Sequence, residues 1–338
     1  MFFLAGLLGM MVLGSVAVVS TADPEPEDDS MDRTGEASGT GLQAGDDMTA
    51  TGSLFEQLRL VDQVEEDSTG RIEEGGSGDD LLNGTDQTDL LGGADGDDTL
   101  SGGGDDDELV GGAGADNLSG DAGADTLHGE GDWDTISGGS GDDALFGHSG
   151  SDLMQGGDGN DSLQGGLGDD ALHGDAGDDA LLGREGADTL DGGLGQDTLF
   201  GGWGDDMLNG VERGPDGTDA DGMDFLNGAD GADTIAIGTA DVVSGGDGAD
   251  TMVLGHWITG DAAELVDFDS AEDQIMIVYD DSTNDEPELD IRLSADDPNI
   301  SEIVLDGHVV STLPTADAPG LDAVVLVGES TAQALSLG

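Results

Sequence analysis

The chain has 338 residues, and its 78 Asp and Glu residues against 6 Arg and no Lys give a formal net charge of -72. This charge repels phosphate and anionic lipid, which excludes nucleic-acid binding and argues against binding to anionic membrane surfaces. With 63 Gly and only 3% aromatic residues, the chain cannot fill the thick core of an ordinary globular enzyme. The absence of cysteine excludes disulfides and thiolate metal sites. Two classes remain: a disordered polyanion, or a fold held together by cations.

The chain begins with an apolar segment, residues 1–22, in which Met1 to Val19 carry no charged side chain. At about 1.5 Å per residue a helix of this length crosses most of a hydrocarbon layer of ~30 Å. A secretory signal normally starts with basic residues, which are absent, whereas Ser20 and Ala22 fit the small residues before a cleavage point. A cleaved signal, a membrane anchor through residues 1–20 and a buried core helix all stay open. The first two predict export.

Residues 23–74 are acidic and rich in Pro, Ser, Thr and Gly. Such a segment buries too little apolar surface to offset its ordering entropy, so we predict a linker that is mostly disordered. Within it, the apolar residues Leu54, Phe55, Leu58 and Val61 have the spacing of a short helix over residues 53–64.

A nonapeptide repeat fills the middle of the chain, with fifteen units in unbroken register from Gly75 to Asn209. Position one is always Gly, position six is always Asp, and position eight is always Leu, Ile or Met. The glycine-rich half of each unit, GGxGxD, suits a tight turn. The other half predicts a three-residue strand with one side chain inward and two outward. A strand this short is not stable alone, so neighbouring units must stack.

The same nonapeptide is the signature of calcium-binding parallel β-helices. The chain therefore resembles the hemolysin-type RTX family of secreted calcium-binding proteins, over residues 75–209 and again from about Asp219 to Val253. The resemblance implies an all-β fold, a right-handed parallel β-roll over residues 75–253 in which two nonapeptide units complete one coil. Units n and n+2 then lie on the same side. The register breaks at residues 210–218, which we interpret as a loop.

The resemblance also implies multiple Ca²⁺ ions, bound between successive turns by the position-six carboxylate and by backbone carbonyls of the glycine turn. The implied carboxylate ligands are Asp80, Asp89, Asp98, Asp107, Asp116, Asp125, Asp134, Asp143, Asp152, Asp161, Asp170, Asp179, Asp188, Asp197, Asp206, Asp224, Asp233 and Asp250. The implied carbonyl ligands are those of Gly114, Gly141, Gly159, Gly168, Gly177 and Gly195.

Elementary physics agrees with this interpretation. Ca²⁺ takes six to eight oxygen ligands. Stacked Asp residues would form two rows of negative charge that repel each other unless cations lie between them. Asp could instead serve only as a turn former, but a turn would also accept Asn or Ser, and none of the fifteen units has either at position six.

Some units depart from the repeat, and other chemistry is sparse. Position four is Gln87, Asp105 or Asp132 in three units, and Arg184 replaces the second glycine of another, so several sites should be imperfect. The chain has neither an HExxH zinc-protease motif nor a GxSxG nucleophile elbow.

Histidine and aromatic residues also follow the period. His128 and His173 share position nine but are five periods apart, which predicts opposite sides of the roll and no shared metal. Phe146 and Phe200 are six periods apart and should share a face, where exposed aromatic residues could mark a partner surface.

The tail, residues 254–338, has less glycine and reads as a separate β-rich domain. We predict strands at 274–279, 289–293 and 323–327, and a hairpin of 300–305 with 308–313 around an Asp-Gly turn. Because an open roll end invites aggregation, the tail should be a cap. The acidic segment 267–273 is either one more cation site or a solvated turn.

These observations predict a secreted or surface-tethered extracellular protein that folds on binding Ca²⁺ and is not an enzyme. The resemblance implies type I secretion through an uncleaved signal in the tail, which conflicts with the apolar N-terminus. Two rivals stay open: an RTX-associated secreted enzyme with an unrecognised site in 254–338, and an adhesin or matrix component with the roll as spacer.

Overall fold

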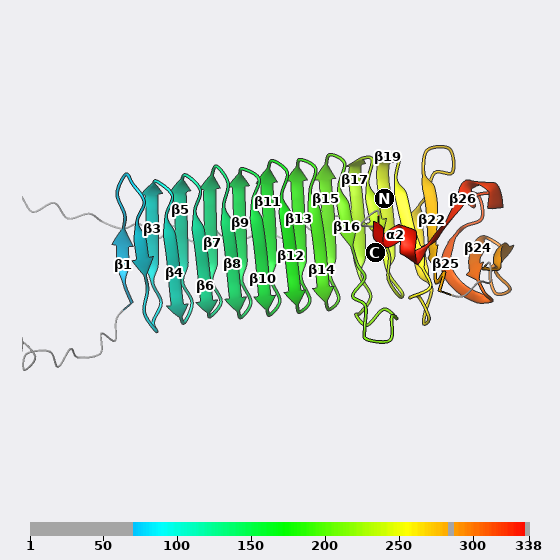
Figure 1. The fold of residues 1–338 in the computed structure, drawn as a ribbon, viewed down its shortest axis with the longest axis horizontal. Coiled ribbons are helices and arrows are strands. Elements are labelled where there is room, and N and C mark those ends of the chain that lie inside the picture. Colours follow the sequence, from blue (N-terminus) through cyan, green and yellow to red (C-terminus); the bar gives the residue numbers. More distant parts are fainter. Residues whose placement is uncertain (1–69, 283–286, 335–338) are drawn as a thin grey trace, which may run out of the picture. The chain divides into compact units, whose positions relative to one another are not determined.

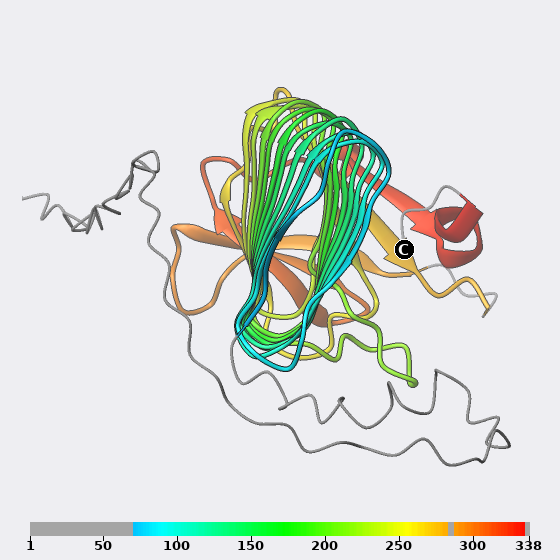
Figure 2. The same ribbon diagram turned by 90° about the vertical axis from the view of Figure 1, so that its left-hand side faces the viewer.

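The computed structural model describes residues 70–282 and 287–334, which form a parallel β-roll followed by a short β-rich end (Figure 1). Viewed along its axis, the roll is a flattened coil with two facing layers (Figure 2). The predicted apolar segment at 1–22 and the predicted helix at 53–64 lie outside the described residues. No helix within 70–282 and 287–334 is both long and apolar enough to cross a membrane.

The two layers are β-sheets, named here the odd sheet and the even sheet after their strand numbers. The odd sheet contains β1 (Ile72–Glu74), β3 (Leu90–Asp95), β5 (Glu108–Ala113), β7 (Thr126–Gly131), β9 (Ala144–Ser149), β11 (Ser162–Leu167), β13 (Ala180–Glu185), β15 (Thr198–Trp203), β17 (Phe225–Gly231), β19 (Val242–Gly248) and β21 (Ala263–Asp267). The even sheet contains β2 (Leu81–Asn83), β4 (Thr99–Gly104), β6 (Asn117–Ala122), β8 (Thr135–Ser140), β10 (Leu153–Asp158), β12 (Ala171–Ala176), β14 (Thr189–Leu194), β16 (Met207–Asn209), β18 (Thr234–Ala236), β20 (Thr251–Gly255) and β22 (Gln274–Tyr279).

Each strand pairs in parallel with the strand one coil away. Leu163 of β11, for example, is in register with Leu145 of β9 and Leu181 of β13. Partners are therefore offset by two nonapeptide units, which confirms the two-unit coil predicted from the sequence. The position-eight side chains point inward from both sheets and form one continuous aliphatic ladder, almost all of it fully buried.

The strands are longer than the three residues predicted. Most span six residues, from position seven of one unit to position three of the next, and both position eight and position one face inward. Position one is the second inward residue of each strand, and it must lack a side chain. A Cβ at Gly156 would overlap the Oδ2 atom of Asp161 and lie 2.8 Å from the carbonyl oxygen of Gly174.

The loop after β16 inserts one extra unit's length of chain into one coil. Thr198 pairs with Phe225, three units later instead of the usual two, so the roll resumes in register after the loop. The next coil is one residue short, because Phe225 pairs with Val242, whereas a full coil would bring it to Val243. The loop packs on the tail: the Arg213 guanidinium lies 4.2 Å from the ring centre of Trp257 and its Nη1 lies 3.0 Å from Glu329 Oε1.

The tail differs from the separate domain expected, because it prolongs both sheets of the roll. β21 and β22 pair in parallel with β19 and β20, and β26 (Val324–Gly328) extends the even sheet beyond β22. Among the described strands, antiparallel pairing is confined to β23 (Leu289–Leu293) with β24 (Ile300–Leu305) and to β24 with β25 (His308–Pro314), which form the predicted hairpin. β25 also pairs in parallel with β21. The 3₁₀ helix η1 (Leu321–Ala323) and the short helix α2 (Glu329–Ala334) flank β26.

At the other end, the roll begins inside the segment that the sequence assigns to linker. β1, within residues 23–74, pairs in parallel with β3 as the first strand of the odd sheet.

Candidate calcium sites

The position-six aspartates form two buried ladders along the roll, one at each turn. In each ladder the backbone N–H of one Asp donates to Oδ1 of the Asp one coil later; Asp143 N lies 2.8 Å from Asp161 Oδ1, and Asp161 N lies 2.7 Å from Asp179 Oδ1. One ladder contains Asp89, Asp107, Asp125, Asp143, Asp161, Asp179, Asp197, Asp224 and Asp241. The other contains Asp80, Asp98, Asp116, Asp134, Asp152, Asp170, Asp188, Asp206, Asp233, Asp250 and Asp273.

The second carboxylate oxygen of these residues is buried without a hydrogen-bond partner among the described residues. This holds for Oδ2 of Asp98, Asp107, Asp116, Asp125, Asp134, Asp143, Asp152, Asp161, Asp170, Asp179, Asp188, Asp197, Asp206, Asp224, Asp233 and Asp250. A buried acceptor without a partner is costly, and a buried charge more so. A row of such oxygens fits a hard cation, which supplies the missing partner to each.

The glycine turns place backbone carbonyls beside the ladders. A Cβ at Gly159 would lie 2.0 Å from the carbonyl oxygen of Gly141, and one at Gly177 would lie 1.7 Å from that of Gly159, so the position-four glycines stack along the roll. A Cβ at Gly141 would overlap the carbonyl oxygen of Gly123, which is why this position, with φ 127°, requires glycine. Gly195 differs from the other five implied carbonyl ligands, because its oxygen accepts the N–H of Gly222 from the loop at 2.8 Å.

Burial raises the pKa of the ladder aspartates between Asp107 and Asp250, an effect that the N–H donated from the preceding coil partly offsets. The pKa rises to about 6 for Asp107, Asp116 and Asp188 and to about 7 for Asp134, Asp143, Asp170, Asp179, Asp224 and Asp233. Neighbouring ladder carboxylates raise it further. The metal-free ladders are therefore under electrostatic stress at neutral pH, which a divalent cation would relieve.

Sequence reasoning missed a set of carboxylates near the loop. Asp241 belongs to a ladder but follows Asp233 one position earlier than the nine-residue period requires, which hides it from a search at that period. Asp219 and Asp221 each have a buried Oδ1 without a hydrogen-bond partner among the described residues. Burial and contact with Asp219 raise the pKa of Asp221 to about 9, and burial beside Asp224 raises that of Asp241 to about 8.

Position five carries a further, exposed set of hydrogen bonds between coils. Asp142 Oδ1 accepts the N–H of Asn160 at 2.9 Å, and Asn160 Oδ1 accepts the N–H of Asp178 at 2.8 Å. The frequency of Asp and Asn at position five was the available signal. These side chains stabilise the stacking of turns and leave polar oxygens on the surface beside the buried rows.

A family model described as the RTX calcium-binding nonapeptide repeat (4 copies), in which one full match spans four nonapeptides, matches five segments of the chain. These are residues 74–109, 110–145, 146–181, 182–210 and 238–255. The repeat region of this chain belongs to the RTX calcium-binding family. The RTX match is interrupted between 210 and 238, where the structure has the loop and the shortened coil. No curated protein matches the chain. The RTX roll is thus a calcium-binding structural repeat. The Oδ2 atoms that lack hydrogen-bond partners among the described residues lie in its two aspartate ladders.

The histidine and aromatic residues that follow the repeat period are distributed over both sheets of the RTX roll. His128 and His173 lie on opposite sheets, in β7 and β12, and Phe146 and Phe200 share the odd sheet, as the spacing predicts. A cavity of about 560 Å³ opens on the odd sheet, lined among others by Leu182, Phe200, Trp203, Gln164, Arg184 and Glu185.

Proposed function

We propose that this protein folds on binding Ca²⁺ outside the cell and serves there as a non-enzymatic structural or adhesive component. The observation that carries the proposal is the pair of ladders whose Oδ2 atoms lack hydrogen-bond partners among the described residues. At cytosolic calcium these carboxylates repel one another, which favours the expanded chain. At extracellular calcium the ions bridge successive coils, and binding to the folded state stabilises it by mass action.

Limited proteolysis tests the coupling between calcium and folding. In chelator, a protease should degrade the repeat region rapidly. In millimolar Ca²⁺, a fragment that begins near β1 should persist. Equal resistance under both conditions would contradict the proposal.

Export is the second part of the proposal, and residues 1–22 or a type I signal in the tail would direct it. Fractionation of the producing cells separates the outcomes. Protein in the medium supports secretion, protein on intact cells that is sensitive to added protease supports tethering, and protein retained in the cytosol contradicts both.

The adhesive role is favoured by the cavity on the odd sheet. Trp203 and Phe200 line it and are 61% and 40% exposed. Aromatic faces beside Gln164, Arg184 and Glu185 fit a sugar ring, which offers an apolar face and hydroxyl groups. Titration with oligosaccharides should change the Trp fluorescence of the wild type. A response that Trp203→Ala leaves unchanged would exclude this cavity.

The enzyme alternative has a candidate location in the described part of the tail. In the described tail, Asp267, Asp269 and Asp317 line a cavity of about 370 Å³. The backbone N–H of Asp269 donates to Asp273 Oδ2 at 2.7 Å, and the N–H of Asp273 donates to the carbonyl oxygen of Asp269 at 2.8 Å, as in a local turn. We propose that this turn is structural. A hydrolytic activity that Asp269→Asn abolishes without loss of folding would overturn that.

A further inference from the structure

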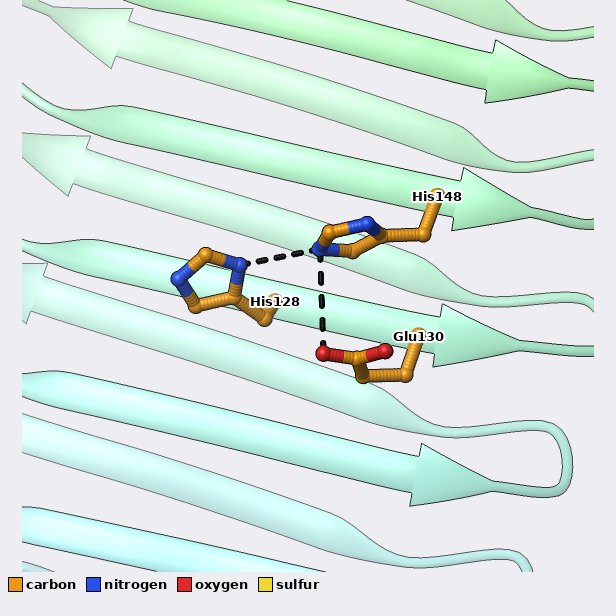
Figure 3. A group of neighbouring side chains, drawn as sticks. All are labelled: His128, Glu130 and His148. Atoms are coloured by element: carbon orange, nitrogen blue, oxygen red, sulfur yellow. Dashed lines mark hydrogen bonds and ion pairs between the residues drawn. The ribbon is translucent and has the colours of Figure 1, made fainter.

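Three side chains converge on the outer face of the odd sheet, away from the aspartate ladders (Figure 3). His128 Nδ1 lies 3.0 Å from His148 Nε2, and Glu130 Oε1 lies 3.8 Å from the same nitrogen. The three potential ligand atoms all lie within 4.8 Å of one another. The side chains of His148 and Glu130 are 37% and 51% exposed, so an ion from solvent can reach them.

The parallel register of β7 and β9 builds this cluster. Glu130 is paired directly with His148, and His128 with Phe146. The Phe146 ring stacks on the His128 ring with centroids 4.8 Å apart and planes 11° apart, which holds the imidazole in place. His148 lies one coil and two further positions after His128, so their side chains meet across adjacent strands.

Two of the three residues occupy position two of the repeat, which is glycine in eight of the fifteen units. Glu130 and His148 are at position two with φ of 80° and 74°, a region unfavourable for side chains other than glycine. The neighbouring units of the odd sheet have Gly112 and Gly166 there. Two successive coils thus accept backbone strain, and both place a metal-ligating side chain at the same spot.

The donor set selects a different class of ion from the ladders. Two imidazole nitrogens and one carboxylate are ligands that Zn²⁺ prefers, and three protein ligands leave a fourth position open. Bonds of about 2.1 Å in a tetrahedral site place ligand atoms roughly 3.4 Å apart, between the two observed separations. Ca²⁺ takes oxygen ligands, so the two imidazole nitrogens do not suit it.

We propose that His128, Glu130 and His148 bind a borderline divalent cation, Zn²⁺ or a similar first-row metal, separately from calcium. The proposal goes beyond calcium-dependent folding and does not depend on it. The protein then has two kinds of metal site: oxygen ladders within the turns, and a nitrogen-containing site on a sheet face. His148 also lines the odd-sheet cavity, so the bound ion would lie at its edge.

The test is calorimetric titration of Zn²⁺ into the full chain in saturating Ca²⁺, which occupies the aspartate ladders first. The variants are His128→Ser and His148→Gly, both chosen from residues that other units have at the same positions. The matched control is His173→Ser, at position nine of the even sheet, whose Nδ1 lies 3.7 Å from Asp191 Oδ2. Circular dichroism in Ca²⁺ should show the same fold for all four proteins.

The wild type and His173→Ser should bind one equivalent of Zn²⁺ tightly, and His128→Ser and His148→Gly should bind it at least tenfold more weakly. Because His148→Gly removes a strained residue, loss of binding there cannot be attributed to loss of folding. Absence of the tight equivalent in the wild type, or equal Zn²⁺ affinity in all four proteins, would overturn the proposal.

Discussion

The backbone N–H of Asp161 donates to Oδ1 of Asp179 at 2.7 Å, across one full coil of the roll. The same Asp161 accepts the N–H of Asp143 at 2.8 Å, so each ladder is continuous. Asp170, one unit away, belongs to the other ladder and bonds Asp188. One repeat unit in sequence thus becomes half a coil in space, and every second unit shares one turn.

Replacing Asp161 with Ala and Leu163 with Ala should separate calcium binding from packing. Asp161→Ala removes a ligand, so its folding should need several-fold more Ca²⁺ and should recover when Ca²⁺ is raised. Leu163 is 1% exposed, and Leu163→Ala should cost ~2–5 kcal/mol at any calcium concentration. Urea unfolding at several calcium concentrations measures both. Full rescue of Leu163→Ala by calcium would refute this division of roles.

Double substitutions should reveal the two ladders. Asp161→Ala with Asp179→Ala should be non-additive by about 0.5–3 kcal/mol, because the two residues are bonded. Asp161→Ala with Asp170→Ala should be nearly additive, because the residues lie in different ladders. Double-mutant cycles at fixed Ca²⁺ measure both couplings, and similar values for the two pairs would argue against the roll.

The free energy of unfolding should depend on pH in opposite directions without and with calcium. Without calcium, several ladder carboxylates, among them Asp107, Asp134 and Asp143, have folded-state pKa values raised to about 6 or 7, so the folded state binds more protons than the unfolded state. The free energy of unfolding should therefore fall as pH rises from about 4 to about 7. With saturating Ca²⁺ it should rise with pH, since the ligands must be deprotonated.

Far-UV circular dichroism of the calcium-free protein at pH 4, 5, 6 and 7 checks this, in high salt to screen repulsion between exposed carboxylates. The β signal should be strongest near pH 4 and should be lost toward pH 7, and a β signal that increases over this range would contradict the raised pKa values.

The inward glycine at position one should be irreplaceable. Gly156→Ala places a Cβ against Asp161 Oδ2 and the Gly174 carbonyl, so we expect it to destabilise the roll by about 1–3 kcal/mol. Gly78→Ala is the control, since a Cβ there meets nothing within 4 Å. It should leave stability unchanged or raise it by about 0.4–1 kcal/mol. The urea midpoints of the two variants in Ca²⁺ compare their stabilities. Equal midpoints would contradict a steric requirement for glycine at position one.

The roll itself could be predicted from sequence because its two determinants, Asp at position six and an aliphatic residue at position eight, never vary within the fifteen units. Strand length could not, because positions one to three of each unit carry little side-chain signal. Nothing in the composition of 254–338 shows that β21 and β22 extend the sheets, since pairing there depends on backbone register rather than on a repeated side chain.

The candidate metal sites were also predicted only in part. The Asp ladders follow from periodicity, whereas Asp241 was missed because the coil that leads to it from Asp224 is one residue short. The contact between His128 and His148 was not predicted, because the two residues occupy different repeat positions, nine and two. Once a coil is known to comprise two units, residues separated by one coil and two positions become neighbours, and that signal was present in the sequence.

The central claim, that cations hold the roll together, is tested most directly by far-UV circular dichroism during a calcium titration of chelator-treated protein. We expect the spectrum of a largely disordered chain without calcium and a cooperative gain of β signal as Ca²⁺ reaches the millimolar range. Mg²⁺ at the same concentration is the control. A compact β-rich spectrum in excess chelator, unchanged by added calcium, would contradict it.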